Sequence, residues 1–311
     1  MKTAVIIGLG KQAFKHAEAL LDFANFQILG VDPDDQASAS FEENFNLKTY
    51  SSFSNIPQCF RENVSLAVIC SPVSKRIETI KNLVDSGIKE FVVEKPLSVT
   101  VAECNDFLAM EDKHCCRFFV NYTYRLSTPF FQIRKMDVIN KLGINYGLFH
   151  LGGRGSHQEW KHRLKSDGGV YNEMAVHMLD LSNYLFGRIY NYQICCEELV
   201  RPRRVIKGKK VDVDAPDLFV QTNEHQKATS VIVSDFLSPY FSNSVHLTSE
   251  HKQLDLKIGQ ETDELNEMFP ALFKIDDCGN NSYRRLYSLI QSGDPENIIH
   301  RPIDTLNLIR N

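Results

Sequence analysis

The stretch that most constrains this chain is residues 3–21, where an apolar run leads through a glycine turn into a helix-forming segment. Residues 3–7 favour a strand and are too apolar for a half-exposed one, which predicts a central strand of a parallel sheet. Gly8, Gly10 and Ala13 follow at the spacing G-x-G-x-x-[GA]. Strand, glycine turn and helix in this order form the dinucleotide fingerprint, because the helix N-terminus offers free N–H groups to a pyrophosphate.

Each position of the glycine turn has its own task in holding a dinucleotide. Gly8 permits the tight turn, Gly10 lets the backbone approach the pyrophosphate, and Ala13 is small enough for the helix to pack on the strand. Lys11 and Gln12 lie between these small residues. We therefore predict cofactor contacts from all five positions.

An acidic residue completes the fingerprint. Residues 26–31 predict the next strand, and Asp32 follows it directly. A carboxylate there accepts hydrogen bonds from the adenosine ribose. The 2′-phosphate of NADP would be repelled by Asp32, Asp34 and Asp35, and no basic residue occurs before Lys48 to bind it. The sequence therefore favours NAD over NADP. The alternative to dinucleotide binding is that these residues form only a glycine turn and a solvated acidic loop.

Composition and charge exclude several classes of protein. A formal charge of −4 argues against nucleic acid or an anionic membrane as the main partner. No apolar run reaches the roughly 18 residues of a membrane span, and no signal peptide precedes the first strand. The eight cysteines show no C-x-x-C pair and no zinc spacing. We therefore expect reduced thiols and a cytoplasmic location.

The order of predicted elements indicates two domains. Up to residue 121, strands and helices alternate in the rhythm of a doubly wound parallel sheet. The strands after the first two are predicted at 47–50, 66–70, 90–94 and 117–120, with helices at 75–86 and 101–112. In the second part, turns rather than crossover helices join strands predicted at 146–150, 190–195, 218–222, 228–236, 245–249 and 254–258. Helices are predicted there at 130–139, 170–186 and 283–292, with a short one from 303.

The fold class predicted from this order is α/β. It consists of an N-terminal Rossmann domain, residues 1–121, and an α/β domain, residues 122–311, with a mostly antiparallel open sheet.

A lysine follows the strand predicted at 90–94, in the sequence Glu94-Lys95-Pro96. This is the carboxyl edge of the sheet, where open α/β sheets bind ligands. A lysine there can hydrogen-bond a substrate hydroxyl and, with a pKa lowered by burial, relay its proton. Pro96 favours an extended Lys95 and leaves open whether the peptide bond is cis. The alternative is an exposed lysine paired with Glu94.

A second group of reactive side chains lies in the predicted helix 170–186. Glu173 and His177 are four residues apart and Asp180 is three residues further on, so all three share one helical face. A histidine flanked by carboxylates can act as a general base near neutral pH. The alternative is a buried histidine that holds the helix in place through a hydrogen bond to Asp180.

Two other clusters favour structure over chemistry. His157 and His162 flank Trp160 and could join Glu173 and His177 around a metal, but no metal-ligand motif supports this, and no metal is expected. Residues 201–210 carry six basic side chains, which are typical of an exposed hairpin loop. Contact with a nucleotide-sugar phosphate or with another subunit is the alternative.

Together these motifs resemble the Gfo/Idh/MocA family, named after glucose–fructose oxidoreductase, inositol dehydrogenase and rhizopine catabolism. The glycine turn matches the family's opening, and residues 94–97 match its E-K-P-L motif. Residues 168–180 are similar to G-G-x-x-x-D-x-x-x-H-x-x-D, with Glu173 in place of the usual Asp. Ser71 and Pro72 begin a segment similar to T-P-N-x-x-H, in which Arg76 replaces the histidine.

The resemblance implies hydride transfer between NAD and a secondary alcohol of a sugar, cyclitol or nucleotide sugar. His177 would be the general base, Lys95 would polarise the hydroxyl, and Glu173 would be the second acidic residue of the site. The implied substrate contacts are Lys95, Asn121, Arg125, Glu173 and His177. The implied cofactor contacts are Gly8, Gly10, Lys11, Gln12, Ala13, Asp32, Ser71, Pro72, Arg76, Glu94 and Lys95. The second domain's sheet would form a homodimer or homotetramer.

Two other functions stay open. One is an enzyme that retains NAD and oxidises a sugar carbon transiently, for epimerisation or glycosidic cleavage. The other is a non-catalytic dinucleotide-binding regulator, which the presence of both Lys95 and His177 disfavours. Substrate specificity is expected from residues 152–167, with Arg154, Trp160 and Arg163 among them.

Overall fold

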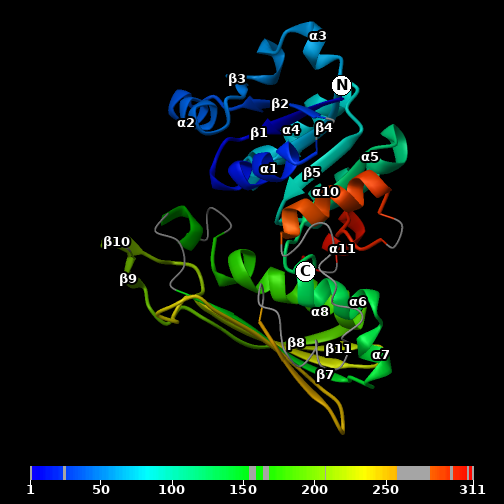
Figure 1. The fold of residues 1–311 in the computed structure, drawn as a ribbon. Coiled ribbons are helices and arrows are strands. Elements are labelled where there is room, and N and C mark those ends of the chain that lie inside the picture. The colour runs from blue at the N-terminus through cyan, green and yellow to red at the C-terminus, as the bar shows by residue number, and fades with distance from the viewer. Residues whose placement is uncertain are drawn as a thin grey trace. The chain divides into compact units, whose positions relative to one another are not determined.

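The computed structural model describes residues 2–23, 26–153, 159–163, 168–206, 208–257, 281–294, 297–306 and 308–309. The chain divides into two compact units (Figure 1). One unit comprises residues 1–123 together with 283–311, and the other comprises residues 124–282.

A six-stranded parallel sheet forms the centre of the first unit. Its strands are β1 (Lys2–Ile7), β2 (Phe26–Val31), β3 (Lys48–Tyr50), β4 (Val64–Ile69), β5 (Glu90–Glu94) and β6 (Arg117–Asn121). Their order is β3-β2-β1-β4-β5-β6, which confirms the predicted doubly wound sheet. The middle strands are buried on both faces because helices cover both sides of the sheet (Figure 1).

Two of the helices of this unit begin at a side-chain cap. The helices are α1 (Lys11–Leu21), α2 (Asp35–Phe45), α3 (Gln58–Arg61), α4 (Val73–Asp85) and α5 (Val101–His114), with a 3-10 turn η1 (Phe53–Asn55). Asp34 caps α2 by accepting hydrogen bonds from two backbone N–H groups, and Thr100 caps α5 in the same way through one. In contrast, α1 begins after Gly10 with no side-chain cap among the described residues.

The C-terminal segment differs from the predicted domain division. The sequence interpretation placed it in residues 122–311, but α10 (Ser282–Ser292) and α11 (Pro302–Leu306) pack on the first unit. Leu286 and Tyr287 of α10 are buried there, and Val120 of β6 donates a backbone hydrogen bond to His300. The apolar stripe of α10 was readable from the sequence, but a stripe does not say which sheet covers it.

A second six-stranded sheet forms the other unit. Its strands are β7 (Tyr146–Gly152), β8 (Ile189–Glu198), β11 (Leu218–His225), β12 (Thr229–Asp235), β13 (Ser242–Thr248) and β14 (Gln253–Leu256). They lie in the order β14-β13-β7-β12-β11-β8, and every pair is antiparallel except β7 with β12. The predicted, mostly antiparallel sheet is therefore confirmed. Residue 258, the end of the last predicted strand, lies outside the described residues.

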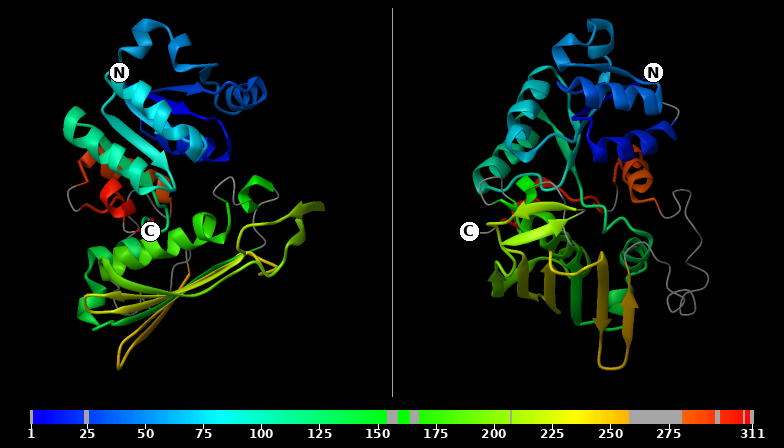
Figure 2. Two further views of the ribbon diagram at one scale, coloured as in Figure 1. Left: turned by 180° about the vertical axis from the view of Figure 1, so that it is seen from behind. Right: turned by 90° about the vertical axis from the view of Figure 1, so that its left-hand side faces the viewer.

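Helices lie along one face of this sheet (Figure 2). They are α6 (Thr128–Lys135), α7 (Val138–Lys141) and α8 (Val176–Phe186), with a 3-10 turn η2 (Glu159–His162) and a π-helical turn η4 (Tyr171–Ala175). The basic stretch forms a separate hairpin of β9 (Arg203–Ile206) and β10 (Lys209–Asp212), as predicted. None of the described helices is long and apolar enough to cross a membrane.

Candidate functional site

The glycine turn has the geometry that the fingerprint predicts. Gly8 adopts φ +88°, and a Cβ at this position would lie 2.8 Å from the backbone nitrogen of Ser71. Only glycine fits such a position without displacing the backbone that follows β4. Gly10 differs, because a Cβ there would meet no atom within 4 Å. The space beside Gly10 is open at the uncapped N-terminus of α1, which is where a pyrophosphate would lie.

Asp32 connects the end of β2 to the glycine turn. Its Oδ2 accepts a hydrogen bond from the Leu9 N–H at 2.7 Å, and its Oδ1 accepts one from the Asp34 N–H at 2.9 Å. A carboxylate has about four lone-pair positions, so each oxygen can still accept a further hydrogen bond. The side chain is thus held in place with capacity left for ribose hydroxyls.

The two residues between the glycines and Ala13 are exposed. Lys11 and Gln12 form the first turn of α1, and Ala13 is buried against the sheet. Gln12 accepts a hydrogen bond from the Tyr283 hydroxyl at 2.8 Å. The C-terminal helix therefore holds one side of the turn, a contact that no local sequence pattern indicates.

Arg76 joins the ends of β4 and β5. Its side chain is buried and donates hydrogen bonds to the carbonyl oxygen of Ser71, at 2.9 Å, and to that of Pro96. Burial lowers the pKa of Arg76 to about 10, against the opposing attraction of Glu94. The sequence predicts Arg76 as a cofactor contact, but the structure directs its guanidinium to these two carbonyls. The Ser71 hydroxyl is buried and has no hydrogen-bond partner in the described part of the chain, so it can donate to a ligand.

Glu94 is the centre of a buried hydrogen-bond network. Its Oε1 lies 2.9 Å from His16 Nε2 and accepts a hydrogen bond from Asn121 Nδ2 at 2.7 Å. The other nitrogen of His16 lies 2.6 Å from the Tyr287 hydroxyl. Burial raises the pKa of Glu94, but hydrogen bonds from His16 and Asn121, with electrostatic attraction from His16 and Arg76, outweigh it and leave the pKa below its usual range.

This network changes the interpretation of two predicted ligand contacts. Glu94 and Asn121 hold each other at the ends of β5 and β6, and both are buried. Asn121 Oδ1 is buried without a hydrogen-bond partner among the described residues, so this atom is left to accept a hydrogen bond. The peptide bond between Lys95 and Pro96 is cis, which the sequence left open. Lys95 itself is half-buried at the carboxyl end of β5.

Sequence reasoning missed His16. It lies on α1 with Ala13, Ala17 and Leu20 on the face that packs against the sheet. A polar residue within an apolar helical stripe needs a buried partner, and this rule could have marked the residue. The partners could not have been named, because Glu94 and Tyr287 are far from it in the sequence.

In the second unit, a π-helical turn over Tyr171–Ala175 precedes α8. It follows Gly169, whose φ of +108° turns the chain into the helix. Glu173 forms an ion pair with Lys161 of η2 at 2.7 Å. Since a π turn widens the spacing of side chains, the regular helical face predicted for Glu173 and His177 is altered here.

His177 lies against the ring of Tyr124, with the ring centres 4.5 Å apart and the planes tilted by 30°. Burial raises the pKa of Tyr124 to about 12, so its ring is neutral at physiological pH. His177 is half-buried, and its Nδ1 is inaccessible to solvent. The aromatic contact fixes the plane of the imidazole.

Asp180 pairs with Arg125, which the sequence predicts as a substrate contact. Arg125 Nε donates to one carboxylate oxygen at 2.9 Å, and Nη2 donates to the other. Both residues are buried, and the guanidinium lies 5.0 Å from the centre of the Tyr184 ring. The structure thus places Arg125 and Asp180 in a bidentate ion pair that attaches α8 to the segment before α6.

No three metal-ligating side chains cluster among the described residues. His162 is buried and packs edge-on against Phe236, with ring centres 5.0 Å apart. His157 and Arg154, named with it in the sequence interpretation, lie outside the described residues. Arg163 Nη1 lies 3.5 Å from a carboxylate oxygen of Asp214.

The Rossmann sheet and its glycine turn agree with a match to a known family. Residues 2–122 match the family model for GFO_IDH_MocA, described as the oxidoreductase family with an NAD-binding Rossmann fold. The match covers 121 of the 311 residues, so the likeness to the Gfo/Idh/MocA family is shown for the part of the chain up to residue 122. These residues match the NAD-binding Rossmann fold of that family, and Gly8, Asp32 and the buried Ser71 hydroxyl fit a dinucleotide.

Curated relatives are distant. Glucose-6-phosphate 3-dehydrogenase of Bacillus subtilis (strain 168) is 24% identical over 194 residues, which are 60% of this chain and 54% of that enzyme. The uncharacterized oxidoreductase YrbE of the same organism is 24% identical over 125 residues, which are 40% of this chain and 36% of that protein. The chain therefore spans about half or less of the length of these two relatives.

The fold of the whole chain is shared with solved structures. The WlbA dehydrogenase of Bordetella pertussis, solved in complex with NADH and UDP-GlcNAcA, superposes with a TM-score of 0.77 at 16% identity. The match covers 99% of this chain and 92% of that one. Both units of the chain therefore have counterparts in that fold.

Proposed function

We propose that this protein is an NAD-dependent oxidoreductase that transfers hydride between the nicotinamide and a secondary alcohol of a sugar, cyclitol or nucleotide sugar. The family supports this, as do relatives that act on glucose 6-phosphate or were solved with a nucleotide sugar. The observation that carries the proposal is that hydrogen bonds hold the E-K-P motif in place on both sides of Lys95. Arg76 holds the Pro96 carbonyl, and the His16–Glu94–Asn121 network holds the end of β5.

In the proposed mechanism, bound NAD supplies the acceptor for hydride. Lys95 donates a hydrogen bond to the substrate hydroxyl oxygen and stabilises negative charge there as the O–H bond weakens. His177 accepts the hydroxyl proton. We assign this proton to Nε2, because Nδ1 is inaccessible to solvent. Tyr124 fixes the plane of the imidazole, and the Lys161–Glu173 pair steadies the turn before it.

Cofactor choice is the first part of the test. We expect NADH to bind more tightly than NADPH in a fluorescence titration, because Asp32 would repel a 2′-phosphate. Asp32→Ala should weaken NADH binding and reduce the difference between the two cofactors. Tighter binding of NADPH by the unmodified protein would refute the assigned role of Asp32.

Turnover is the second part of the test. We expect Lys95→Met and His177→Gln each to lower kcat/KM by about 10²- to 10⁴-fold on a sugar that the unmodified enzyme oxidises, with NADH binding retained. Lys89→Met, which removes an exposed lysine one residue before β5, is the matched control. Normal turnover in both site variants would overturn the assignment. NAD released only on denaturation would support the cofactor-retaining alternative, and binding without turnover of any sugar would support the regulator.

We also propose a homodimer or homotetramer formed through the sheet of the second unit. Its edge strand β8 exposes Tyr190, Tyr192 and Ile194, and large apolar side chains in water favour association. Light scattering on the purified protein tests this, and Tyr190→Lys with Tyr192→Lys should shift the mass toward the monomer.

A further inference from the structure

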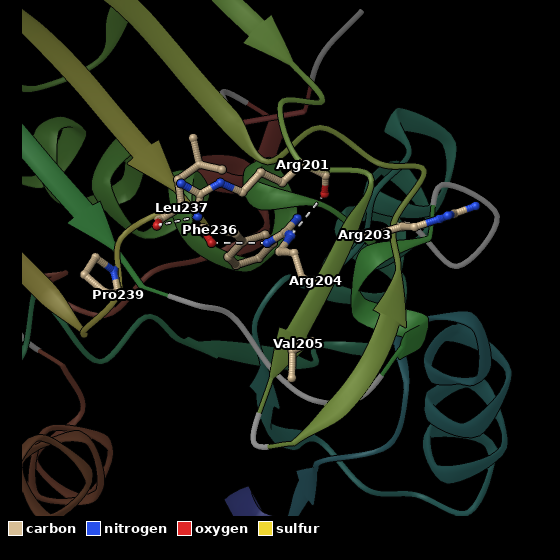
Figure 3. Close-up of a pocket in the computed structure, with 7 residues that line it drawn as sticks. All are labelled: Arg201, Arg203, Arg204, Val205, Phe236, Leu237 and Pro239. Atoms are coloured by element: carbon tan, nitrogen blue, oxygen red, sulfur yellow. Dashed lines mark hydrogen bonds between the residues drawn. The ribbon is translucent and has the colours of Figure 1, made fainter.

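The second unit contains a cavity lined largely by arginine. Its volume is about 330 Å³, and it lies between the β9 strand and the segment that follows β12 (Figure 3). The lining residues are Arg201, Arg203, Arg204, Val205, Phe236, Leu237 and Pro239. Three of these seven are basic and none is acidic, so the wall of the cavity favours an anion.

A buried aspartate fixes the shape of this cavity from behind. Asp217 accepts hydrogen bonds from the Val200 N–H at 2.7 Å and the Arg201 N–H at 3.0 Å. Its backbone carbonyl accepts a third hydrogen bond, from the Phe236 N–H at 2.8 Å. Both walls are therefore attached to one residue, and the cavity is preorganised rather than formed by loose loops.

Arg204 has a hydrogen-bond donor left over in this cavity. Its side chain is only 7% exposed, and it donates to the carbonyls of Phe236, at 3.2 Å, and Arg201, at 3.4 Å. The remaining nitrogen, Nη2, is buried and makes no hydrogen bond to any residue in the described part of the chain. It lies 3.2 Å from a carboxylate oxygen of Asp217, which gives charge attraction without hydrogen-bond geometry. The ion pair therefore leaves Nη2 without a well-aligned hydrogen bond, and an anionic ligand could supply one.

The charges around the cavity leave a positive excess. Arg201 and Arg204 extend toward the carbonyls of Phe236 and Leu237, whereas Arg203 points away from them (Figure 3). Asp217 neutralises one of the two converging guanidinium groups. Burial lowers the pKa of Arg204 and the charge of Arg201 lowers it further, although Asp217 opposes both. A bound anion would relieve the repulsion between the two arginines.

We propose that this cavity is a binding site for a phosphoryl group, with Arg201 and Arg204 as its ligands. A guanidinium presents several N–H donors in a planar fork that matches the oxygens of a phosphate. Inorganic phosphate and the phosphate ester of a small metabolite share this chemistry. A cavity of about 330 Å³ also leaves room for the organic part of an ester.

Calorimetric titration of the full chain at constant ionic strength tests the site. The probes are inorganic phosphate, ribose 5-phosphate and, as the uncharged comparison, ribose. We expect saturable binding of a phosphate-bearing probe and none of ribose. Tighter binding of ribose 5-phosphate than of phosphate would identify an ester as the ligand, and equal binding would identify inorganic phosphate. Absence of saturable binding of both would overturn the proposal and leave the arginines to contact a protein partner.

Two arginine variants and one control locate the binding. Arg201→Met should weaken phosphate binding by roughly 10- to 100-fold, the effect of losing a hydrogen bond to a charged group. Arg204→Met should weaken binding in the same way, provided that circular dichroism shows a folded protein. If Arg204→Met does not fold, Arg201→Met still tests the site, because Arg201 is exposed. Lys209→Met removes one positive charge from β10 outside the cavity and should bind like the unmodified chain. An equal loss in this control would show general charge attraction and refute a built site. Since no turnover is measured, the result is independent of the proposed reaction.

Discussion

The ion pair between Arg125 and Asp180 allows a quantitative test of how the second unit holds His177. Asp180→Asn keeps the shape of the side chain but removes its charge, which leaves the Arg125 guanidinium buried without its counter-ion. Asp180 is 1% exposed and Arg125 is 5% exposed, so water cannot replace the lost partner. Breaking a buried pair by removing one partner costs about 3–5 kcal/mol.

Because asparagine still accepts one hydrogen bond, we expect a value near the lower limit, about 3 kcal/mol. For a unit of this size, each kcal/mol lowers the melting temperature by about 2–4 °C, so Tm should fall by about 6–12 °C. The chain has a single tryptophan, Trp160, which belongs to the second unit. Thermal unfolding followed by its fluorescence therefore reports on the unit that carries the pair.

A double-mutant cycle separates the ion pair from local packing. Arg125→Met and Asp180→Leu each leave one buried charge unpaired, whereas the variant that combines these two substitutions leaves no buried charge. We expect the double variant to be less destabilised than the sum of the singles by at least about 2 kcal/mol. A loss below about 1 kcal/mol in Asp180→Asn, or simple additivity in the cycle, would refute the reasoning. Arg125 would then be available for substrate.

Two further predictions concern the first unit. Gly8→Ala should lower stability by about 1–3 kcal/mol and weaken NADH binding, because its Cβ would lie 2.8 Å from the Ser71 nitrogen at a positive φ. Gly10→Ala should weaken NADH binding but keep the melting temperature, and a matched loss of stability would contradict this difference. The pKa of Glu94 is lower in the folded chain than its usual value, so its negative charge stabilises the fold at pH values above the usual pKa. This stabilisation is lost as the pH falls through the lower pKa of the folded state. Between about pH 5 and pH 3, unfolding free energy should therefore fall more steeply in the unmodified chain than in Glu94→Gln, and parallel curves would contradict this.

Local patterns predicted the order of elements and the cofactor fingerprint because each depends on neighbouring residues. The glycine turn needs a positive φ at Gly8 and a small residue at Ala13, and both requirements are visible in a few consecutive letters. The parallel strands were recognisable as apolar runs because both of their faces are buried. Gly187 likewise ends α8 where the helical pattern stops.

Long-range partners were not predictable in the same way. Arg76, Glu94, Asn121 and Arg125 all stand in motifs that suggest ligand contacts, yet the structure directs most of their polar atoms to other protein groups. A motif shows that a polar residue is needed at a position. It does not show whether the partner is a ligand or another side chain, since that depends on what the fold brings within hydrogen-bond distance.

The sequence by itself determined the Rossmann order of the first unit and the mostly antiparallel sheet of the second. These follow from periodicity and turn chemistry, which act over a few residues. Only the tertiary structure decided that the C-terminal helix belongs to the first unit, that His16 and Tyr287 meet at Glu94, and that Arg201 and Arg204 line one cavity. Such contacts join residues distant in sequence, and burial of polar groups selects their partners only once the chain has folded.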